Sequence, residues 1–534
     1  MATNITQNYG FVLQQMAAEA YFEGVDLNET EDVRNTLIRG NNRLGFVDKG
    51  FTKFTSTQAD EFLSKFKIIH QASDNPNSPG TSPGVLRTVP AYYDGSTILA
   101  NTGMSATLIK SIDGSNEYTL AIRSTEFRTT DDGGDRTRDA LGADVEGIVT
   151  TGFALAQLAA LEDYYAWMKA TPNMLPSGAK LNVTGYSLGG HLATVFTEMH
   201  ASDTDIQFLN TYTFNGAGRG KLGARAANPD EIVSFYRAIL ADPDSAGLGS
   251  TIISPTFDFS GLGSSTPGSV ETLRAMYHAA LAATGQPMDP VNIYNDARYI
   301  WAHAATSYQY ALVPNNPFNL DQGSADLKSG AAGKIAQIYG KEFPVSSTLV
   351  ANSGVHGNAM GAFIEQQPLI EGLLGSASDF GNAHALVLIA DSLALMRVFL
   401  LLQPDLSLDA MNRLFAGASN KYAESSILDR ANSRAEDNAL ESSLDALRGI
   451  FLGQGIEPTP YTSGASGFGD IDSRNAYYNN IEELTGNADF IASAGTLRFV
   501  DLTGKSSAEL QSLAQSAVGY RYALLHLNPF AVIG

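Results

Sequence analysis

Residues 180–194 read Lys-Leu-Asn-Val-Thr-Gly-Tyr-Ser-Leu-Gly-Gly-His-Leu-Ala-Thr, and this stretch is the strongest indication of the fold class. It begins as a short apolar run that predicts a buried strand, passes through Gly-Tyr-Ser-Leu-Gly at 185–189, and continues with a pattern typical of a helix. In a Gly-x-Ser-x-Gly turn the serine lies on a sharp bend between strand and helix, and the flanking glycines let neighbouring backbone pack closely. This context predicts that Ser187 is a nucleophile and not part of an ordinary glycine-rich turn.

The composition limits the class of protein. The chain has 534 residues, of which 44% are hydrophobic and 17% charged, which fits a globular protein with a large core. Its net charge of −22 disfavours a nucleic-acid partner and opposes general attraction to an anionic membrane surface. The chain contains no cysteine, so disulfides, thiolate metal sites and a cysteine nucleophile are excluded. Nucleophilic catalysis would therefore fall to Ser187.

The cellular location is predicted from two segments. The first residues lack a basic region followed by an apolar run, so no cleavable secretory signal is expected. The most apolar segment, 383–402, contains His384, Asp391 and Arg397, which predicts a buried helix and not a membrane span. These features fit a bacterial protein that is secreted without a cleavable signal peptide, with a cytoplasmic location as the alternative.

The sequence predicts three parts. Residues 1–85 are expected to form a helical leader that ends in a loop rich in proline and glycine. Residues 86–400 are expected to form an α/β catalytic domain with a mostly parallel central sheet, and 401–534 a mainly helical extension. Within the catalytic domain, 221–288 is too long for an ordinary connection and partly apolar, so it is predicted to be a lid-like insertion, with a structural subdomain as the alternative.

The predicted elements follow the order of the α/β-hydrolase fold. Two β-like runs at 105–112 and 118–124 are joined by a turn signal, and the second is expected to lie beside the nucleophile strand. A long helix is predicted within 140–170, ahead of the nucleophile strand. The next parallel strands are expected at 209–215 and 291–294.

A serine hydroxyl needs a histidine to accept its proton, and that histidine needs a carboxylate to fix its tautomer. In α/β hydrolases the histidine follows the serine and the acid in the chain. His384 leads directly into the apolar helix and is the favoured base, with His356 in a glycine-flanked loop as the main alternative. His191 and His200 lie on the elbow helix itself, and we expect them to be packing or solvent-facing residues.

Asp296 is the favoured acid. It ends Asn-Ile-Tyr-Asn-Asp at 292–296, where a sheet strand would deliver a carboxylate to its carboxyl-terminal edge, the edge at which ligands and catalytic groups collect. The rival carboxylates lie in the insertion or before this strand: Asp242, Asp244, Asp258 and Asp289.

Four places in the sequence resemble bacterial lipases and esterases of the α/β-hydrolase fold, including the lipase-like modules of large secreted calcium-binding proteins. Residues 121–125 resemble the strand end that supplies the first oxyanion-hole residue, here Thr125, with Ser124 where the family usually has glycine. The elbow resembles Gly-His-Ser-Leu-Gly-Gly, with Tyr186 in place of the histidine. The other two places resemble the acid-bearing strand and the histidine segment, at 291–297 and 382–395.

The resemblance implies a serine carboxylic-ester hydrolase that works through an acyl-enzyme. Ser187 would attack the ester, His384 would accept and return the proton, and Asp296 would orient the imidazole. The amides of Leu188 and Thr125 would stabilise the oxyanion.

The partly apolar insertion favours lipid esters as substrates, so we expect a lipase or phospholipase that meets a lipid–water interface without being an integral membrane protein. The alternatives are hydrolysis of another acyl substrate, such as a thioester, polyester or peptide, and a non-catalytic binding module with this fold. No cofactor is expected. The acidic, glycine-rich loops at 131–135 and 467–472 are candidates for calcium, but such loops are usually just solvated.

Overall fold

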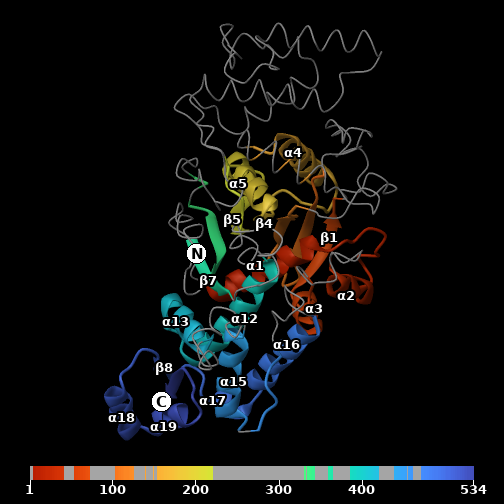
Figure 1. The fold of residues 1–534 in the computed structure, drawn as a ribbon. Coiled ribbons are helices and arrows are strands. Elements are labelled where there is room, and N and C mark those ends of the chain that lie inside the picture. Colours follow the sequence, from red (N-terminus) through yellow and green to blue (C-terminus); the bar gives the residue numbers. More distant parts are fainter. Residues whose placement is uncertain are drawn as a thin grey trace, which may run out of the picture.

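A seven-stranded sheet forms the centre of the molecule (Figure 1). The computed structural model describes residues 4–40, 53–72, 103–125, 139, 143, 148, 153–219, 330–331, 333–342, 359–364, 385–419, 438–453, 455–460 and 471–534. The strands, in their order across the sheet, are β1 (Phe66–Gln71), β2 (Ala106–Ser111), β3 (Glu117–Ile122), β4 (Lys180–Tyr186), β5 (Gln207–Phe214), β6 (Ile335–Glu342) and β7 (Ala359–Ile364). The first three strands are antiparallel neighbours, whereas β3 to β7 run parallel. The predicted α/β class with a mostly parallel sheet is therefore confirmed.

The strands around the elbow agree with the sequence. The predicted hairpin is formed by β2 and β3, and its turn places Gly114 and Asn116 at positive φ. Strand β3 pairs with β4, as expected, and β5 covers the strand predicted at 209–215. The strand predicted at 291–294 lies outside the described residues. On the side of β5 away from β4, the described strand is β6.

Helices cover both faces of the sheet. On one face lie α4 (Leu155–Ala170) and α5 (Leu188–His200), which connect β3 to β4 and β4 to β5. Successive right-handed crossovers between neighbouring parallel strands place both connections on the same face. On the other face lie α1 (Ile5–Glu19) and α12 (Leu386–Leu402). The buried helix predicted at 383–402 is thus confirmed.

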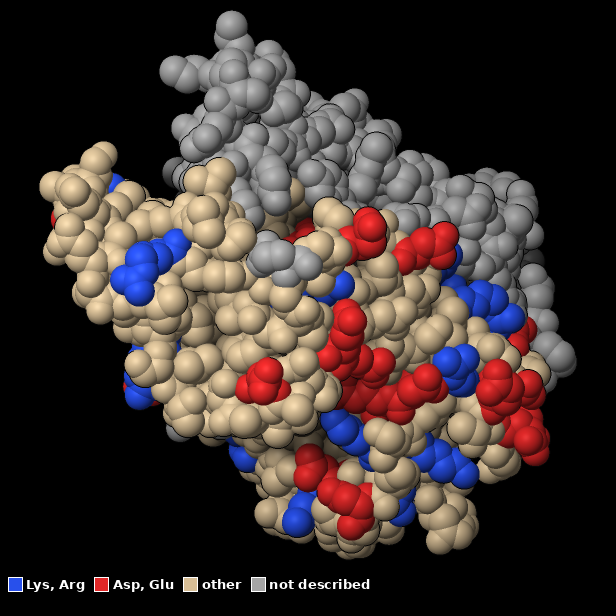
Figure 2. Space-filling model, turned by 90° about the horizontal axis from the view of Figure 1, so that it is seen from below, with Lys and Arg blue, Asp and Glu red and all other residues tan. Residues whose placement is uncertain are grey.

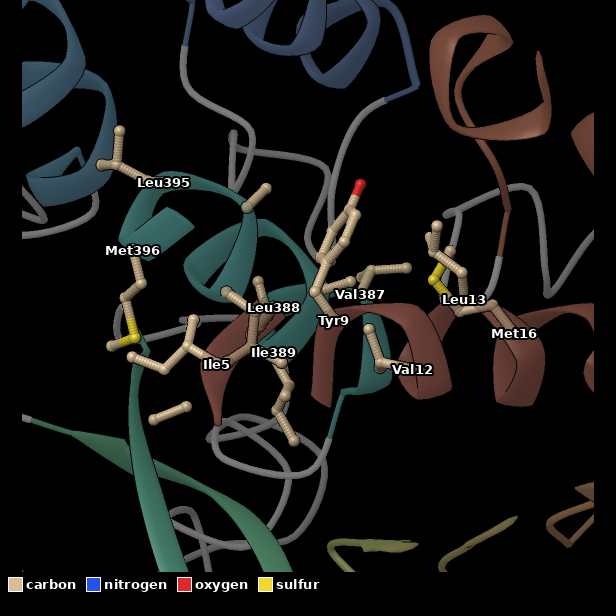
Figure 3. Packing of buried hydrophobic residues seen from close by; sticks show 14 of the residues in the cluster. Ile5, Tyr9, Val12, Leu13, Met16, Val387, Leu388, Ile389, Leu395 and Met396 are labelled. Atoms are coloured by element: carbon tan, nitrogen blue, oxygen red, sulfur yellow. The ribbon is translucent and has the colours of Figure 1, made fainter. Parts of the chain in front are cut away.

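The contact between α1 and α12 forms much of the core on the second face. Figure 3 shows Val12 and Met16 of α1 together with Leu388 and Ile389 of α12, all of them nearly or fully buried. Phe11 extends this contact to the sheet, since its ring stacks on that of Tyr212 with centroids 3.9 Å apart. The N-terminal helix is therefore part of the body of the molecule.

The predicted boundary at residue 85 remains a prediction, but the sheet already includes a strand from before it. Besides β1, the first 85 residues supply α2 (Thr30–Arg39) and α3 (Ser56–Leu63). Strand β1 was missed by the sequence analysis because His70 and Gln71 interrupt its apolar pattern.

The described residues of the C-terminal part are mainly helical and include one small sheet. The helices are α13 (Leu408–Ser419), α15 (Ala439–Phe451), α16 (Ile471–Thr485), α17 (Ala488–Ala492), α18 (Ser507–Ser516) and α19 (Val518–Leu525). The strands β8 (Arg498–Asp501) and β9 (Phe530–Ile533) form an antiparallel pair that was not predicted.

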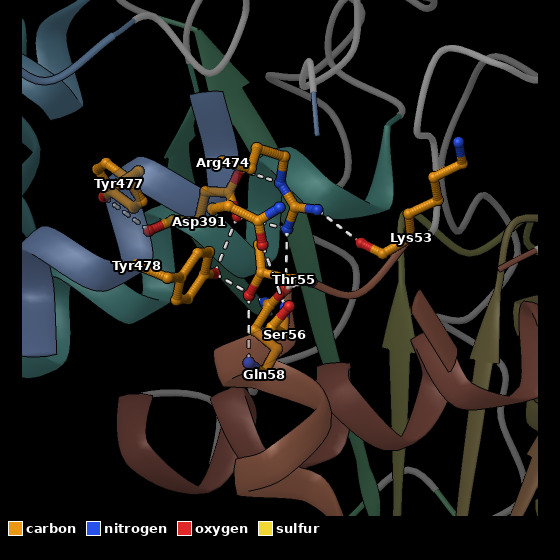
Figure 4. Close-up of polar contacts among 9 residues, drawn as sticks. Lys53, Thr55, Ser56, Gln58, Asp391, Arg474, Tyr477 and Tyr478 are labelled. Carbon is orange, nitrogen blue, oxygen red and sulfur yellow. Dashed lines mark hydrogen bonds and ion pairs between the residues drawn. The ribbon is translucent and has the colours of Figure 1, made fainter. Parts of the chain in front are cut away.

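A buried ion pair joins α12 to α16 (Figure 4). The Arg474 guanidinium donates two hydrogen bonds, of 2.8 and 2.7 Å, to the two carboxylate oxygens of Asp391. It also donates to the Lys53 carbonyl oxygen at 2.6 Å, and the Tyr478 hydroxyl donates to Asp391 at 2.9 Å. Both charged side chains are fully buried, so this network connects N-terminal and C-terminal segments inside the core.

The surface carries both signs of charge. Figure 2 shows acidic and basic side chains interspersed on one face, with acidic side chains gathered near the middle of the view. Within the part of the chain that the structure describes, no helix is long and apolar enough to span a bilayer.

Candidate active site

Ser187 lies at the bend between β4 and α5. Its backbone has φ 53° and ψ −121°, a conformation that a residue with a side chain rarely adopts. Such a residue costs on the order of 1–3 kcal/mol and persists only where the surroundings impose it. The Ser187 amide donates to the Phe214 carbonyl oxygen, and its own carbonyl oxygen accepts from the amides of Gly190 and Ala217. The end of β5 and the first turn of α5 thus hold the strained bend.

The glycines of the elbow leave no room for a side chain. A Cβ on Gly185 would lie 2.0 Å from the carbonyl oxygen of Gly189, and a Cβ on Gly190 would lie 2.3 Å from the Cα of Gly216. These distances are far below van der Waals contact, so the backbone of α5 packs directly on β4 and on the segment after β5. The predicted strand–turn–helix with serine at its apex is therefore what the structure contains.

The end of β3 lies directly beside the elbow. A Cβ on Gly189 would lie 2.3 Å from the Ile122 carbonyl oxygen and 2.6 Å from that of Arg123. Leu188 is the first residue of α5, and such a residue's amide has no carbonyl partner within its helix. The structure therefore brings the two predicted oxyanion positions, Leu188 and Thr125, to the same end of the sheet.

Ser124 is held by a carboxylate. The side chain of Glu19, the last residue of α1, accepts hydrogen bonds from the Ser124 amide at 3.1 Å and from its hydroxyl at 2.7 Å. The Gln15 side chain donates to Glu19 at 2.8 Å and also to the Ile122 carbonyl oxygen at 2.8 Å. All these residues are buried. The Ser124 side chain thus makes a specific contact at the position where the resembling lipases usually have glycine.

The start of α12 also reaches the elbow. Tyr186, directly before Ser187, is buried, and its hydroxyl accepts a hydrogen bond from the Leu386 amide. Burial raises the pKa of Tyr186, and the nearby Glu19 adds to this rise. The chain two positions after His384 is therefore in contact with the nucleophile's neighbour.

The two histidines of the elbow helix serve packing and ion pairing. His191 is buried, accepts from the Ala154 amide at Nε2, and lies 3.0 Å from the Gly218 carbonyl oxygen through Nδ1. Burial lowers its pKa to about 4. Burial by itself would also lower the pKa of His200, but hydrogen bonds to Asp203 and Glu162 raise it to about 9. Both imidazoles are engaged by these partners, and the expectation that neither is the base stays a prediction.

The remaining predicted residues lie outside the described part of the chain. These are His384, His356 and Asp296, together with the rival carboxylates, the insertion 221–288 and the acidic loop at 131–135. Of the loop at 467–472, only the last two positions are described. The described residues contain no group of three or more His, Asp or Glu side chains able to hold a metal ion.

The end of β6 brings one more residue to this edge that the sequence analysis did not consider. In the sheet, Tyr186 of β4 pairs with Phe214 of β5, and Phe214 pairs with Ile338 of β6. Strand β6 continues beyond Ile338 and ends at Glu342. Because parallel strands share one carboxyl edge, Glu342 belongs to the edge at which Ser187 lies. The run Ile-Ala-Gln-Ile-Tyr at 335–339, followed by Gly-Lys-Glu, was the signal for this strand.

Comparisons with known proteins add little. No family model matches the sequence, and no curated protein matches it. A solved structure described as "Crystal structure of M37 lipase" aligns with a TM-score of 0.21 and 13% identity, over 60% of this chain and 93% of that chain. A likeness this small informs neither fold nor activity, so the function has to be inferred from the elbow itself.

Proposed function

We propose that this chain is a serine carboxylic-ester hydrolase of the α/β-hydrolase fold. The observation that carries the proposal is the backbone of Ser187, a serine at positive φ on a strand-to-helix bend whose flanking glycines cannot accept a side chain. A protein maintains such strain at considerable cost, and strained residues of this kind cluster at active sites. The bend projects a hydroxyl at the carboxyl edge of a parallel sheet, where catalytic groups collect.

The proposed reaction is acyl transfer. The Ser187 oxygen attacks the ester carbonyl while the base takes its proton, and the negative charge that develops on the carbonyl oxygen is stabilised by the amides of Leu188 and Thr125. The base then protonates the leaving alcohol. Water repeats the sequence on the acyl-enzyme and releases the acid. This chemistry requires no cofactor.

His384 is the proposed base. In its favour, Leu386 donates a hydrogen bond to Tyr186, so the chain just after His384 is anchored beside the nucleophile. Two residues span at most about 7 Å. The matching test compares His384→Ala with His356→Ala: only loss of the base should reduce kcat by several orders of magnitude in a folded protein.

For the acid we keep Asp296 and add Glu342, which ends the strand beside β5. Neutralising the carboxylate that orients the imidazole should lower kcat far more than neutralising the other one. We therefore expect one of Asp296→Asn and Glu342→Gln to lower kcat by about 10⁴-fold and the other to leave it nearly unchanged. Rates of p-nitrophenyl ester hydrolysis measured side by side decide between them.

Lipid esters are the proposed substrate class, since the insertion at 221–288 is partly apolar, and the proposed setting is a lipid–water interface. Activity that rises with acyl length from acetate to palmitate supports a lipase or phospholipase. A preference for short acids favours a small-ester hydrolase, and turnover of thioesters, polyesters or peptides would assign one of the alternatives.

The decisive test is covalent labelling and turnover at Ser187. A fluorophosphonate should label the wild-type protein once, and Ser187→Ala should lose both the label and ester hydrolysis. Ser177→Ala is the matched control, because that serine is exposed in the loop before β4 and should leave both intact. Ester turnover that survives Ser187→Ala would refute the hydrolase mechanism.

A further inference from the structure

We infer that Glu19 is a positioning residue for the oxyanion hole, an inference that rests on the proposed function. Its carboxylate accepts hydrogen bonds from the amide and the hydroxyl of Ser124, and so fixes the backbone that presents the Thr125 amide.

The first step of the inference is the way the carboxylate is satisfied. One Glu19 oxygen accepts from the Ser124 amide and from Gln15, and the other accepts from the Ser124 hydroxyl. Two bonds to one residue, one to its backbone and one to its side chain, restrict both its position and its rotation. A glycine at 124 would offer only the amide.

The second step is that α1 itself is fastened to the same segment from the opposite direction. The Arg123 guanidinium donates to the carbonyl oxygens of Ala18 at 3.2 Å and Ala20 at 2.9 Å, at the end of α1. Its charge also lies over the Tyr21 ring, 4.4 Å from the centroid. Residues 123 and 124 are thus bound to the helix end by reciprocal contacts, and neither can shift without the other.

The third step is the distance to the chemistry. The carbonyl oxygens of Ile122 and Arg123 lie so close to Gly189 that no Cβ would fit between them. A displacement of this segment is therefore transmitted to the first turn of α5. The Thr184 hydroxyl of β4 also donates to Gln15 at 2.8 Å, which ties the same network to the nucleophile strand. An amide displaced by about 1 Å from a developing oxyanion loses most of its effect, and such errors cost on the order of 100-fold in rate.

The kinetic test uses Glu19→Ala and its coupling to Ser124. Glu19→Ala should lower kcat for p-nitrophenyl esters on the order of 100-fold with KM changed less than about threefold, because the hole acts mainly on the transition state. Ser124→Ala should show part of this loss. The double variant should lose no more than Glu19→Ala alone, since Glu19 acts through Ser124. Glu19→Gln keeps one oxygen acceptor and should recover much of the rate.

The control is Asp391→Asn, which neutralises another buried carboxylate, the one paired with Arg474 between α12 and α16, and its kcat should stay within about twofold. Equal losses in Glu19→Ala and Asp391→Asn, a rise in KM alone, or multiplied losses in the double variant would overturn the inference. If Glu19→Ala does not fold, Ser124→Ala is compared with Asp391→Asn instead: a partial loss of kcat in the first beside an unchanged kcat in the second supports the inference, and equal kcat values overturn it.

Amide hydrogen exchange separates this inference from the proposed function. In Glu19→Gln and Glu19→Ala the peptide that contains 122–125 should exchange faster, while the α12 peptide stays unchanged. This readout needs no turnover. A wild-type protein without esterase activity would refute the hydrolase proposal, whereas unchanged exchange at 122–125 would refute the role of Glu19.

Discussion

Two buried carboxylates in this molecule, Glu19 and Asp391, are partnered in opposite ways. Asp391 faces a guanidinium that binds both of its oxygens, deep between two helices. Among the residues that the structure describes, Glu19 receives hydrogen bonds from neutral donors, and the nearby Arg123 directs guanidinium hydrogen bonds to backbone carbonyl oxygens. Burial therefore raises the pKa of Glu19, and the hydrogen bonds from Ser124 and the charge of Arg123 only partly offset it.

We attribute this difference to the positioning role inferred for Glu19, whereas Asp391 belongs to an ion pair that connects helices. A paired charge is consistent with a role in holding helices together, whereas a carboxylate kept in the core without a direct cation costs stability. Sites that break such a local rule are expected to be functional. The variants below are ordered from the largest expected effect to the smallest.

Asp391→Ala should destabilise the protein most. The substitution leaves the Arg474 guanidinium buried without its carboxylate, and arginine does not neutralise by losing its proton. We expect a loss of about 3–5 kcal/mol in the free energy of unfolding, measured by urea denaturation. The kcat of the folded fraction at low temperature should remain that of the wild type. A large drop in kcat at unchanged stability would erase the contrast with Glu19.

Gly189→Ala should damage activity more than stability. Its new methyl group would collide with the carbonyl oxygens of Ile122 and Arg123, so the end of β3 and the elbow must move apart. We expect kcat/KM to fall on the order of 100-fold while the circular dichroism spectrum stays unchanged. Gly10→Ala is the matched control, because this helical glycine has open space around its Cα. Equal rates for the two variants would show that the elbow tolerates displacement.

The sequence predicted the elbow region better than the rest of the molecule, for a physical reason. Around Ser187 the local pattern and the fold agree: an apolar strand, glycines where backbones touch, and a helix. Strands β6 and β7 were missed because β6 is interrupted by Gln337 and Gly340, and β7, Ala-Met-Gly-Ala-Phe-Ile, is small and glycine-containing.

The support of the oxyanion segment could not have been predicted from sequence. Glu19 and Ser124 are separated by 105 positions, and nothing in the local pattern around Glu19 distinguishes it from an exposed residue on a helix. Only the packing of α1 across the sheet brings them together. The sequence did single out Ser124, since it stands where the resembling lipases usually have glycine, but it did not indicate the partner of Ser124.

Glu19→Gln should change the pH dependence of stability. A carboxyl with a raised folded pKa binds more protons folded than unfolded between about pH 4.5 and its folded pKa, so its contribution to stability falls as pH rises through that window. The wild type should therefore lose unfolding free energy relative to Glu19→Gln as pH rises from 4 to 8. The variant should be at least as stable near neutral pH, although it is slower. Unfolding free energies from urea denaturation that change with pH in the same way in both proteins would show that burial does not raise the pKa of Glu19.

His200 is a second group that makes the unfolding free energy of the wild type depend on pH, and its contribution has to be measured separately from that of Glu19. His200 has a folded pKa of about 9, so its pairing with Glu162 and Asp203 stabilises the fold fully below about pH 6.5 and is lost as pH rises through 9. We expect His200→Gln to remove the slope between pH 7 and 9 and to leave ester hydrolysis unchanged. A residual slope of the same size would assign it to another group.

Tyr186→Phe should have the smallest effect and tests the other side of the elbow. Removing the hydroxyl leaves the Leu386 amide without this acceptor, which should cost about 1 kcal/mol in unfolding free energy. Because that amide lies just after His384 in the chain, kcat should fall severalfold if His384 is the base, and a Tyr186→Phe/His384→Ala double variant should be no slower than His384→Ala. An equal fractional loss in both backgrounds would mean that Tyr186 acts on Ser187 directly. In that case the start of α12 would contribute to the stability of the fold, as Asp391 does, but not to the position of the base.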